Sequence, residues 1–381
     1  MRKPEILMTP GPTPVPPEAL LAQGAPIVYH RGPGFAKLLT DVTDGLKWIL
    51  ETENDVLTFT CSGTGMMESA VCNLFSAGDK VMVVSVGNFG KRFRKICEAY
   101  GLEVDFVDVP WGQTAKADEI KSRLADDTKA VLVQHSETST GVVNDLEAIG
   151  QVLKDHSALY VVDSVSGVGA ARIKVDAWGI DVCVTGSQKA LMMSPGIGAV
   201  SVSAAAWAAT EEATLPRFYF DWKRTKEFYE KSVPETPFTP AVSLYAGLAA
   251  AIDLIKEEGL ENTYRRHEVM SEAVKQACIA LGLEIFGEDP DRSVCVTAVK
   301  CPEGLDGDEL TKLVRAKYSI IFAPGQDHLK GKIFRIGHIG YLERIDILQA
   351  IAVLELALDE LGYPVKFGTG VAAAQEVFRR A

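Results

Sequence analysis

The sequence has few of the residue patterns that metal centres and disulfide scaffolds require. Its six histidines show no metal-ligand spacing, and its seven cysteines form no Cys-x-x-Cys pair. Most of the cysteines stand in apolar surroundings, which is typical of reduced core thiols in a cytosolic protein. We therefore expect no metal ion, no disulfide framework and a cytoplasmic location.

Long apolar runs and an excess of positive charge are also missing. No run of 18 apolar residues suggests a membrane span, and the first residues lack the apolar segment of a signal peptide. The net charge of -12 argues against nucleic acid or an anionic membrane as the main partner. A hydrophobic fraction of 47% and a charged fraction of 24% are ordinary for a globular protein, and 381 residues are enough for two domains.

Two short, β-branched apolar runs stand out in the middle of the chain. Residues 159–162 form the first run and stop at Asp163, and residues 180–188 contain the second and lead to Lys189. Such runs are typical of buried strands in a parallel sheet. Because ligands bind outside the carboxyl ends of these strands, the acid and the amine are expected at the same rim. Pyridoxal phosphate (PLP) enzymes need this pair, a lysine for the Schiff base and an aspartate that keeps the ring nitrogen protonated.

Each of the two residues also has an ordinary explanation. An aspartate after a strand is most often a helix cap or a turn former, and a lysine is most often at the surface. The pair gains weight only if the chain also supplies a phosphate cup and a group that grips a substrate carboxylate.

A candidate phosphate cup follows the strand expected at residues 56–60. The Ser-Gly-Thr-Gly sequence of residues 62–65 leads into a helix without breakers at residues 66–75. Backbone N–H groups and the helix dipole at such a junction favour an anion, and glycine allows the main chain to approach closely. The stretch is not a Walker loop, which needs Gly-Lys-Ser/Thr. A tight turn without a ligand is the alternative explanation.

The alternation of strands and helices predicts a parallel-rich sheet covered on both faces. Phe89, directly after one expected strand, is a candidate to stack on a flat ring or an ordinary core residue. From about residue 260 the pattern becomes α+β, which indicates a smaller second domain. We expect an arm at 1–34, a large domain at 35–259, a small domain at 260–365 and a frayed tail at 366–381.

The proline-rich arm leaves two possibilities open. It is too rich in proline for regular structure and reads as a linker. A stiff extended segment of this kind can also cross the protein surface or a partner subunit, or join the small domain.

Together these landmarks resemble the class V aminotransferases, of the fold type I PLP family, and in particular the alanine–glyoxylate and serine–pyruvate or serine–glyoxylate aminotransferases. The likeness runs from about residue 9 to about residue 361. It implies a large domain with a mostly parallel seven-stranded sheet and a smaller α+β C-terminal domain. Its most specific parts are Glu137-Thr138-Ser139-Thr140-Gly141, Asp163-Ser164-Val165 and Gly186-Ser187-Gln188-Lys189-Ala190-Leu191.

The resemblance implies roles for residues of this chain. Lys189 would be the Schiff-base lysine and Asp163 the partner of the ring nitrogen. Arg335 would hold the substrate α-carboxylate, which a guanidinium can bind bidentately. Thr239 would reach the phosphate bound by a neighbouring subunit, which implies a homodimer with shared active sites. The other implied contacts to the cofactor are Gly63, Thr64, Gly65 and Gln188 at the phosphate, Phe89 and Val165 at the ring faces, and Thr138 at the ring oxygen or substrate carboxylate.

The activity implied is transfer of an amino group from a small L-amino acid, alanine or serine, to glyoxylate or pyruvate by a ping-pong mechanism. Phosphoserine aminotransferase would need further basic residues for a second phosphate, and no convincing set is present. A cysteine desulfurase needs a cysteine on a mobile loop, which neither Cys295 nor Cys301 resembles. A non-catalytic subunit of a larger complex is the alternative from another class. Residues 204–235 and those after 362 match the family poorly, so substrate choice could depend on them.

Overall fold

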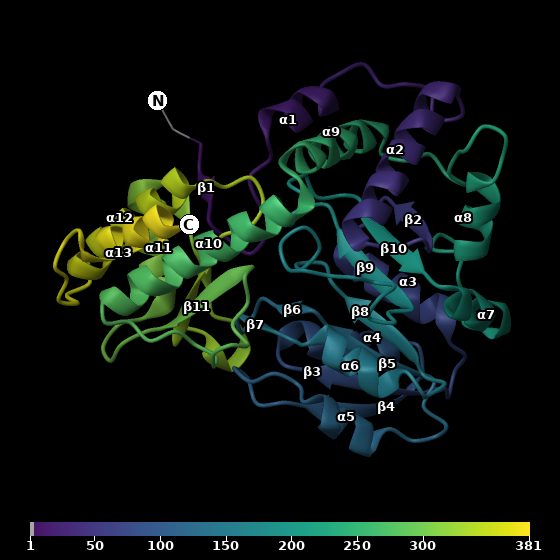
Figure 1. Ribbon diagram of the computed structural model, residues 1–381, viewed down its shortest axis with the longest axis horizontal. Coiled ribbons are helices and arrows are strands. Elements are labelled where there is room, and N and C mark those ends of the chain that lie inside the picture. The colour runs from purple at the N-terminus through teal and green to yellow at the C-terminus, as the bar shows by residue number, and fades with distance from the viewer. Residues whose placement is uncertain (1–3) are drawn as a thin grey trace.

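A seven-stranded sheet forms the centre of the larger part of the molecule (Figure 1). Its strands are β2 (Asp55–Phe59), β3 (Lys80–Ser85), β4 (Glu103–Asp108), β5 (Ala130–Gln134), β8 (Leu159–Asp163), β9 (Val182–Gly186) and β10 (Gly198–Val202). They lie in the order β2-β10-β9-β8-β5-β3-β4, and only β10 runs antiparallel to its neighbours. The mostly parallel seven-stranded sheet is therefore confirmed. The computed structural model describes residues 4–381.

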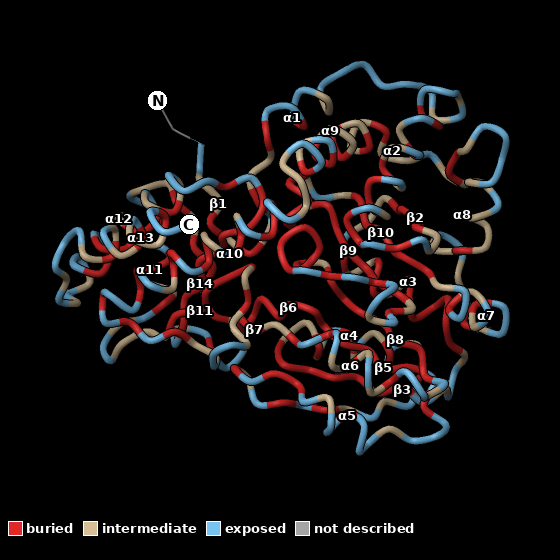
Figure 2. The backbone as a smooth tube through the Cα atoms, in the orientation of Figure 1, coloured by how far each residue is buried: buried red, intermediate tan, exposed pale blue. Residues whose placement is uncertain are grey.

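Successive side chains of the buried strands point to opposite faces of this sheet. Helices cover both faces and pack on these side chains. Val131 and Val133 of β5 belong to one apolar cluster, and Ala130 and Leu132 belong to another. Figure 2 shows this interior as buried backbone. The first cluster includes side chains of α2 (Pro33–Leu50), α5 (Ala117–Arg123), α6 (Leu146–Leu153) and α9 (Val242–Glu258), and the second includes side chains of α3 (Gly63–Leu74), α4 (Asn88–Ala99), α7 (Ala204–Glu212) and α8 (Trp222–Tyr229).

A separate apolar cluster lies in the C-terminal part of the chain. Here the three-stranded antiparallel sheet β11-β14-β13 packs with helices, and α10 connects this part to the larger one (Figure 1). The strands are β11 (Val296–Lys300), β13 (Ala323–Pro324) and β14 (Ile333–Gly337). The helices are α10 (Leu260–Ala280), α11 (Gly307–Tyr318), α12 (Arg344–Glu360) and α13 (Thr369–Arg380), with the 3-10 turn η1 at Asp327–Leu329.

The N-terminal arm is more ordered than its proline content suggests. Strand β1 (Ile6–Leu7) pairs in parallel with β12 (Ile320–Ile321), and Met8 is buried in the C-terminal cluster. The arm therefore joins the C-terminal part, one of the possibilities left open by the sequence. Its helix α1 (Pro17–Gln23) was not expected. Proline is tolerated in the first turn of a helix because the backbone N–H that it lacks would have no intrahelical acceptor there.

The last residues do not fray, so the predicted tail at 366–381 is wrong. They form α13, which packs on α10 and α12 with Phe378 largely buried. The buried Glu355 carboxylate of α12 accepts hydrogen bonds from the backbone N–H groups of Gly368, Gly370 and Val371. A carboxylate at a helix N-terminus satisfies otherwise unpaired donors and stabilises that end.

No helix within residues 4–381 combines the length and the apolar character needed to cross a membrane.

Candidate active site

The carboxyl ends of two adjacent strands bring Asp163 and Lys189 together. Asp163 is the last residue of β8, and Lys189 follows β9, which runs parallel beside β8. Burial raises the pKa of the Asp163 carboxyl to about 6 and lowers the pKa of the Lys189 amine to about 8. Each charge partly offsets the effect of burial on the other, since Lys189 lowers the pKa of Asp163 and Asp163 raises that of Lys189.

The N-terminal arm closes over Lys189. The Lys189 Nζ donates a hydrogen bond of 2.6 Å to the Pro10 carbonyl, and Thr13 Oγ1 donates one of 2.8 Å to the Lys189 carbonyl. Gly11 lies between these contacts with φ +136, and a Cβ at this position would lie 2.5 Å from Nζ. Only glycine satisfies both the backbone angle and the close approach of the lysine. The arm thus forms a wall of the site.

Asp163 starts a tight turn that leads to the phosphate cup. Its Oδ1 accepts a hydrogen bond of 3.0 Å from the Val165 N–H. The Val165 side chain packs on Gly63, where a Cβ would lie 2.6 Å from Val165 Cγ2. The turn after β8 and the start of α3 are therefore in direct contact.

The start of α3 has the unused donors that an anion site needs. Ser62 caps the helix by accepting from the Gly65 N–H, but the N–H groups of Gly63 and Thr64 find no acceptor within residues 4–381. Gln188 Oε1 is buried and also without a partner in this part of the chain. It lies near the Gly63 nitrogen, because a Cβ on the intervening Gly186 would lie 3.0 Å from one and 3.5 Å from the other. Orphaned polar groups at a helix N-terminus fit a phosphate better than a turn without a ligand.

Arg335 is a buried guanidinium in β14. Its Nη1 donates to the Thr138 carbonyl at 2.6 Å, and its Nε and Nη2 donate to the Pro324 carbonyl at 3.0 and 2.7 Å. No carboxylate within residues 4–381 forms an ion pair with it. Burial lowers the pKa of Arg335 to about 10, although nearby Glu137 raises it. Its charge is also felt at Lys189, whose pKa it lowers. A cation held in this way is prepared to receive a carboxylate.

Glu137, whose role was not predicted from the sequence, connects Phe89 with the loop that carries Thr138. It belongs to the small hairpin of β6 (Ser136–Glu137) and β7 (Val142–Val143). Its carboxylate accepts hydrogen bonds from the N–H groups of Phe89 and Gly90 and from the N–H and Oγ of Ser139. Burial raises the pKa of Glu137, and these hydrogen bonds lower it. Its place at the start of the Glu137-Thr138-Ser139-Thr140-Gly141 motif was the signal available in the sequence.

Arg92 is the second residue that sequence reasoning missed. Its guanidinium lies over the half-buried Phe89 ring, 4.6 Å from the centroid, and donates to Thr64 Oγ1 at 3.0 Å. Its charge lowers the pKa of both Asp163 and Lys189. Arg92 therefore lies between Phe89, which is predicted to stack on the cofactor ring, and the phosphate cup. Its position three residues after Phe89 on one helix face could have revealed it.

Thr239 is not part of this cluster. It is exposed in the loop before α9, next to Phe238, whose ring stacks on Tyr219. It shares no hydrogen bond with the residues described above. Its role toward a neighbouring subunit stays a prediction.

The cysteines do not have the environment of a catalytic nucleophile. Cys295 is completely buried and its Sγ donates to the Ser166 carbonyl at 3.1 Å. Cys301 is half-buried, and burial raises the pKa of its thiol to about 12. Both thiols favour the protonated form, which is a poor nucleophile. Within residues 4–381, no three His, Cys, Asp or Glu side chains cluster in a way that could hold a metal ion.

Comparisons with known proteins agree with this geometry. The family model "Aminotransferase class-V" matches residues 19–331. A relative from Synechococcus sp. named "Soluble hydrogenase, small subunit" is 44% identical, with both chains covered completely. The L-aspartate–glyoxylate aminotransferase of Paracoccus denitrificans is 38% identical, and the serine–glyoxylate aminotransferase of Methylorubrum extorquens is 37% identical. In both cases the match covers 98% of this chain and 96% of the relative.

A solved structure gives the same answer for the fold. The ureidoglycine–glyoxylate aminotransferase from Bacillus subtilis superposes with a TM-score of 0.94 at 28% identity, over 100% of this chain and 99% of that one. The predicted family, fold and PLP cofactor are thus confirmed, and the chain belongs to the class V aminotransferases.

Proposed function

We propose that this chain is a transaminase that moves the amino group of a small L-amino acid, alanine or serine, to glyoxylate or pyruvate in a ping-pong reaction. The observation that carries the proposal is the buried Arg335 guanidinium, which has no carboxylate partner within residues 4–381 and whose charge reaches Lys189. A substrate α-carboxylate supplies the missing partner. The serine–glyoxylate relative supports the choice of serine and glyoxylate.

The residues described above account for each part of the cofactor. The N–H groups of Gly63 and Thr64, with Gln188 and Arg92, would hold the phosphate, and Gly65 would let the main chain approach it closely. Phe89 and Val165 would flank the ring, Thr138 would meet its oxygen or the substrate, and Asp163 would meet the ring nitrogen. When bound, PLP acts as an electron sink for the bond that breaks at the substrate Cα.

Lys189 would move the proton. Because burial lowers the pKa of this amine to about 8, a sizeable neutral fraction exists at mildly alkaline pH. A neutral amine can accept the proton from Cα and deliver it again, which is general acid–base catalysis. The arm orients the amine through Pro10, and Arg335 would fix the substrate so that Cα faces it.

A panel of amino donors tests the proposal. L-alanine, L-serine, L-aspartate and O-phospho-L-serine are each assayed with glyoxylate, pyruvate and 2-oxoglutarate. We expect alanine or serine with glyoxylate to give the highest kcat/KM. Preference for phosphoserine with 2-oxoglutarate, or for aspartate, would overturn the substrate assignment but leave the transaminase intact.

The non-catalytic alternative has one observation in its favour, the name of the Synechococcus relative. Mixing the yellow PLP-loaded protein with an amino donor separates the two. Bleaching of the colour indicates an enzyme, and an unchanged colour with every donor favours a structural subunit.

Replacing Arg335 with glutamine is expected to raise KM for the amino donor by about 30- to 100-fold, because a charge-assisted hydrogen bond to a carboxylate is lost. PLP affinity should stay within about twofold, which spectroscopic titration can measure. Arg315→Gln, an exposed residue of α11 paired with Glu5, is the matched control. Loss of the cofactor in the Arg335 variant would place this residue outside the substrate site.

The predicted homodimer is supported by large apolar side chains at the surface, including Leu21, Ile27 and Phe218 at 76%, 73% and 72% exposure. Analytical ultracentrifugation should give the mass of two chains. Thr239→Ala should weaken PLP binding several-fold even though Thr239 lies outside the cluster of its own chain. A monomer with full PLP affinity would contradict the shared site.

A further inference from the structure

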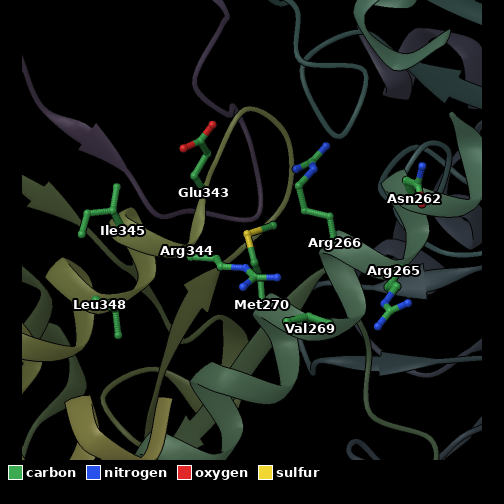
Figure 3. Close-up of a pocket in the computed structure, with 9 residues that line it drawn as sticks. All are labelled: Asn262, Arg265, Arg266, Val269, Met270, Glu343, Arg344, Ile345 and Leu348. Atoms are coloured by element: carbon green, nitrogen blue, oxygen red, sulfur yellow. The ribbon is translucent and has the colours of Figure 1, made fainter. Parts of the chain in front are cut away.

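A hollow lies away from Lys189, between α10 and the start of α12. It encloses about 550 Å³ (Figure 3). Arg265, Arg266 and Arg344 line it together with apolar side chains, among them Val269, Met270 and Leu348. The volume lies within the range of pockets that bind small molecules.

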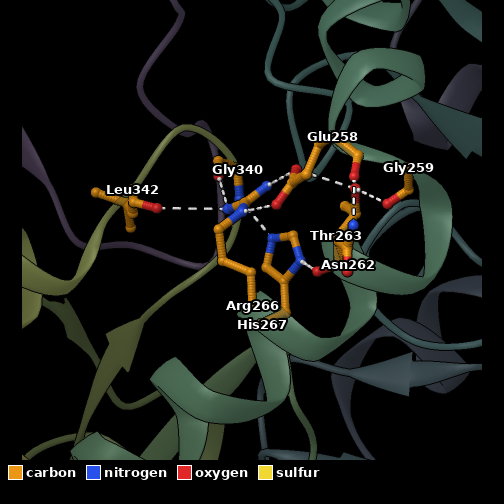
Figure 4. Close-up of polar contacts among 8 residues, drawn as sticks. All are labelled: Glu258, Gly259, Asn262, Thr263, Arg266, His267, Gly340 and Leu342. Carbon is orange, nitrogen blue, oxygen red and sulfur yellow. Dashed lines mark hydrogen bonds and ion pairs between the residues drawn. The ribbon is translucent and has the colours of Figure 1, made fainter. Parts of the chain in front are cut away.

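Arg266 is fixed in place before any ligand arrives. Glu258 accepts from its Nε at 2.6 Å and from its Nη2 at 3.0 Å, and the Gly340 carbonyl accepts from its Nη1 at 2.9 Å (Figure 4). The bidentate ion pair neutralises its charge and holds it as a rigid edge of the hollow. The positive charge that a ligand would meet therefore comes from the other two arginines.

Arg265 and Arg344 keep most of their donors free. Arg265 donates to the backbone oxygen of Ala381 at 2.6 Å, and Arg344 donates to the Phe378 carbonyl at 3.2 Å. Neither forms an ion pair with an Asp or Glu side chain of residues 4–381. The carboxylate that lines the hollow, Glu343, is engaged in the capping box of α12. Each guanidinium has five N–H groups, so several remain for a ligand.

Apart from Asn262, the rest of the lining is apolar. Met270 is buried, and Val269 and Leu348 are half-buried. We propose that this hollow binds a small molecule in which an oxyanion, a carboxylate or a phosphate monoester, is attached to an apolar body. The arginines would take the oxyanion, and the apolar lining would take the body.

This hollow is separate from the predicted cofactor site around Lys189. The segment at residues 338–342 stands between them, since Gly340 meets Arg266 and His267 on one side and Thr13 on the other. Thr13 in turn donates to the carbonyl of Lys189. The inference does not depend on the amino donor or acceptor proposed above.

Isothermal titration calorimetry tests it on the PLP-saturated protein, so that the phosphate cup is already filled. Phenyl phosphate and benzoate are the probes, and benzyl alcohol is the neutral analogue. We expect one site per chain, with benzyl alcohol at least tenfold weaker. The tighter of the two anions identifies the oxyanion that the site takes.

The variants Arg344→Gln and Leu348→Trp should each weaken binding at least tenfold, one by removing charge and the other by filling the hollow. Arg379→Gln, an exposed residue of α13 paired with Glu376, should bind like the parent protein. Binding unchanged in both variants, equal binding of benzyl alcohol or absence of heat with both anions would overturn the proposal. Because Leu348→Trp keeps all the arginines, it tests the site even if Arg344→Gln disturbs α13.

Discussion

Replacing Lys189 with alanine should lower kcat by more than about 10³-fold, because the variant loses the amine that binds the cofactor covalently and moves the Cα proton. No other amine is close enough to replace it among the side chains described around Asp163 and Arg335. Steady-state assays with the best donor and single-turnover reactions with pyridoxamine phosphate measure the loss. The absorbance of the covalent link between PLP and protein should disappear as well.

Two controls separate chemistry from folding in this experiment. Lys154→Ala, in the exposed segment after α6, should leave kcat unchanged. Added methylamine should restore part of the rate of the Lys189 variant, since a small amine can enter the space left by the side chain. Retention of transamination without added amine would show that another group moves the proton.

The part of the site that the sequence predicted is the part built from consecutive strand ends. Asp163 and Lys189 each follow a buried strand, and parallel neighbours must place their carboxyl ends at one rim. The cup at residues 62–65 follows the same rule, because it joins a strand to a helix. At these positions the local sequence predicts both the strand or helix and the edge of the sheet at which the strand ends.

Contacts between distant segments could not be predicted in this way. Pro10 and Lys189 are 179 positions apart, and Arg335 and Thr138 are 197 apart. No hydrophobic period encodes such pairs, so Arg335 came from the family resemblance alone. The prediction of a frayed tail was wrong for a related reason. The start of helix α13 is stabilised by Glu355, a residue of another helix.

The residues that were missed act through backbone groups or across a helix face. Glu137 binds the N–H groups that open α4, so its role depends on where that helix begins relative to the hairpin. Arg92 was given no role from the sequence, and only the fold shows that its side chain turns toward Thr64. A charged residue near a predicted site therefore needs the fold before its role can be assigned.

Replacing Asp163 with asparagine should lower kcat by about 10²–10³-fold, since an amide cannot stabilise the positive charge on the ring nitrogen. The change keeps the shape of the turn, because asparagine Oδ1 can still accept from the Val165 N–H. Cofactor titration should show PLP still bound. Asp126→Asn, an exposed position, should leave kcat unchanged, and full activity of the Asp163 variant would remove this residue from the mechanism.

The same substitution should make the PLP-free protein more stable. Burial raises the pKa of Asp163 from its usual value of 3.8 to about 6, so the folded protein holds this proton more tightly than the unfolded chain does. As pH rises from about 4 to about 6 the unfolded chain ionises first, and the folded state loses stability relative to it. Above that range the cost levels off at roughly 3 kcal/mol. Asp163→Asn removes this cost, so urea unfolding should show a gain in stability that grows from about pH 4 to about pH 6 and then levels off. Equal stability of both proteins at pH 8 would mean that burial of this carboxylate does not destabilise the PLP-free protein. The proposed link between its burial and its function would then be contradicted.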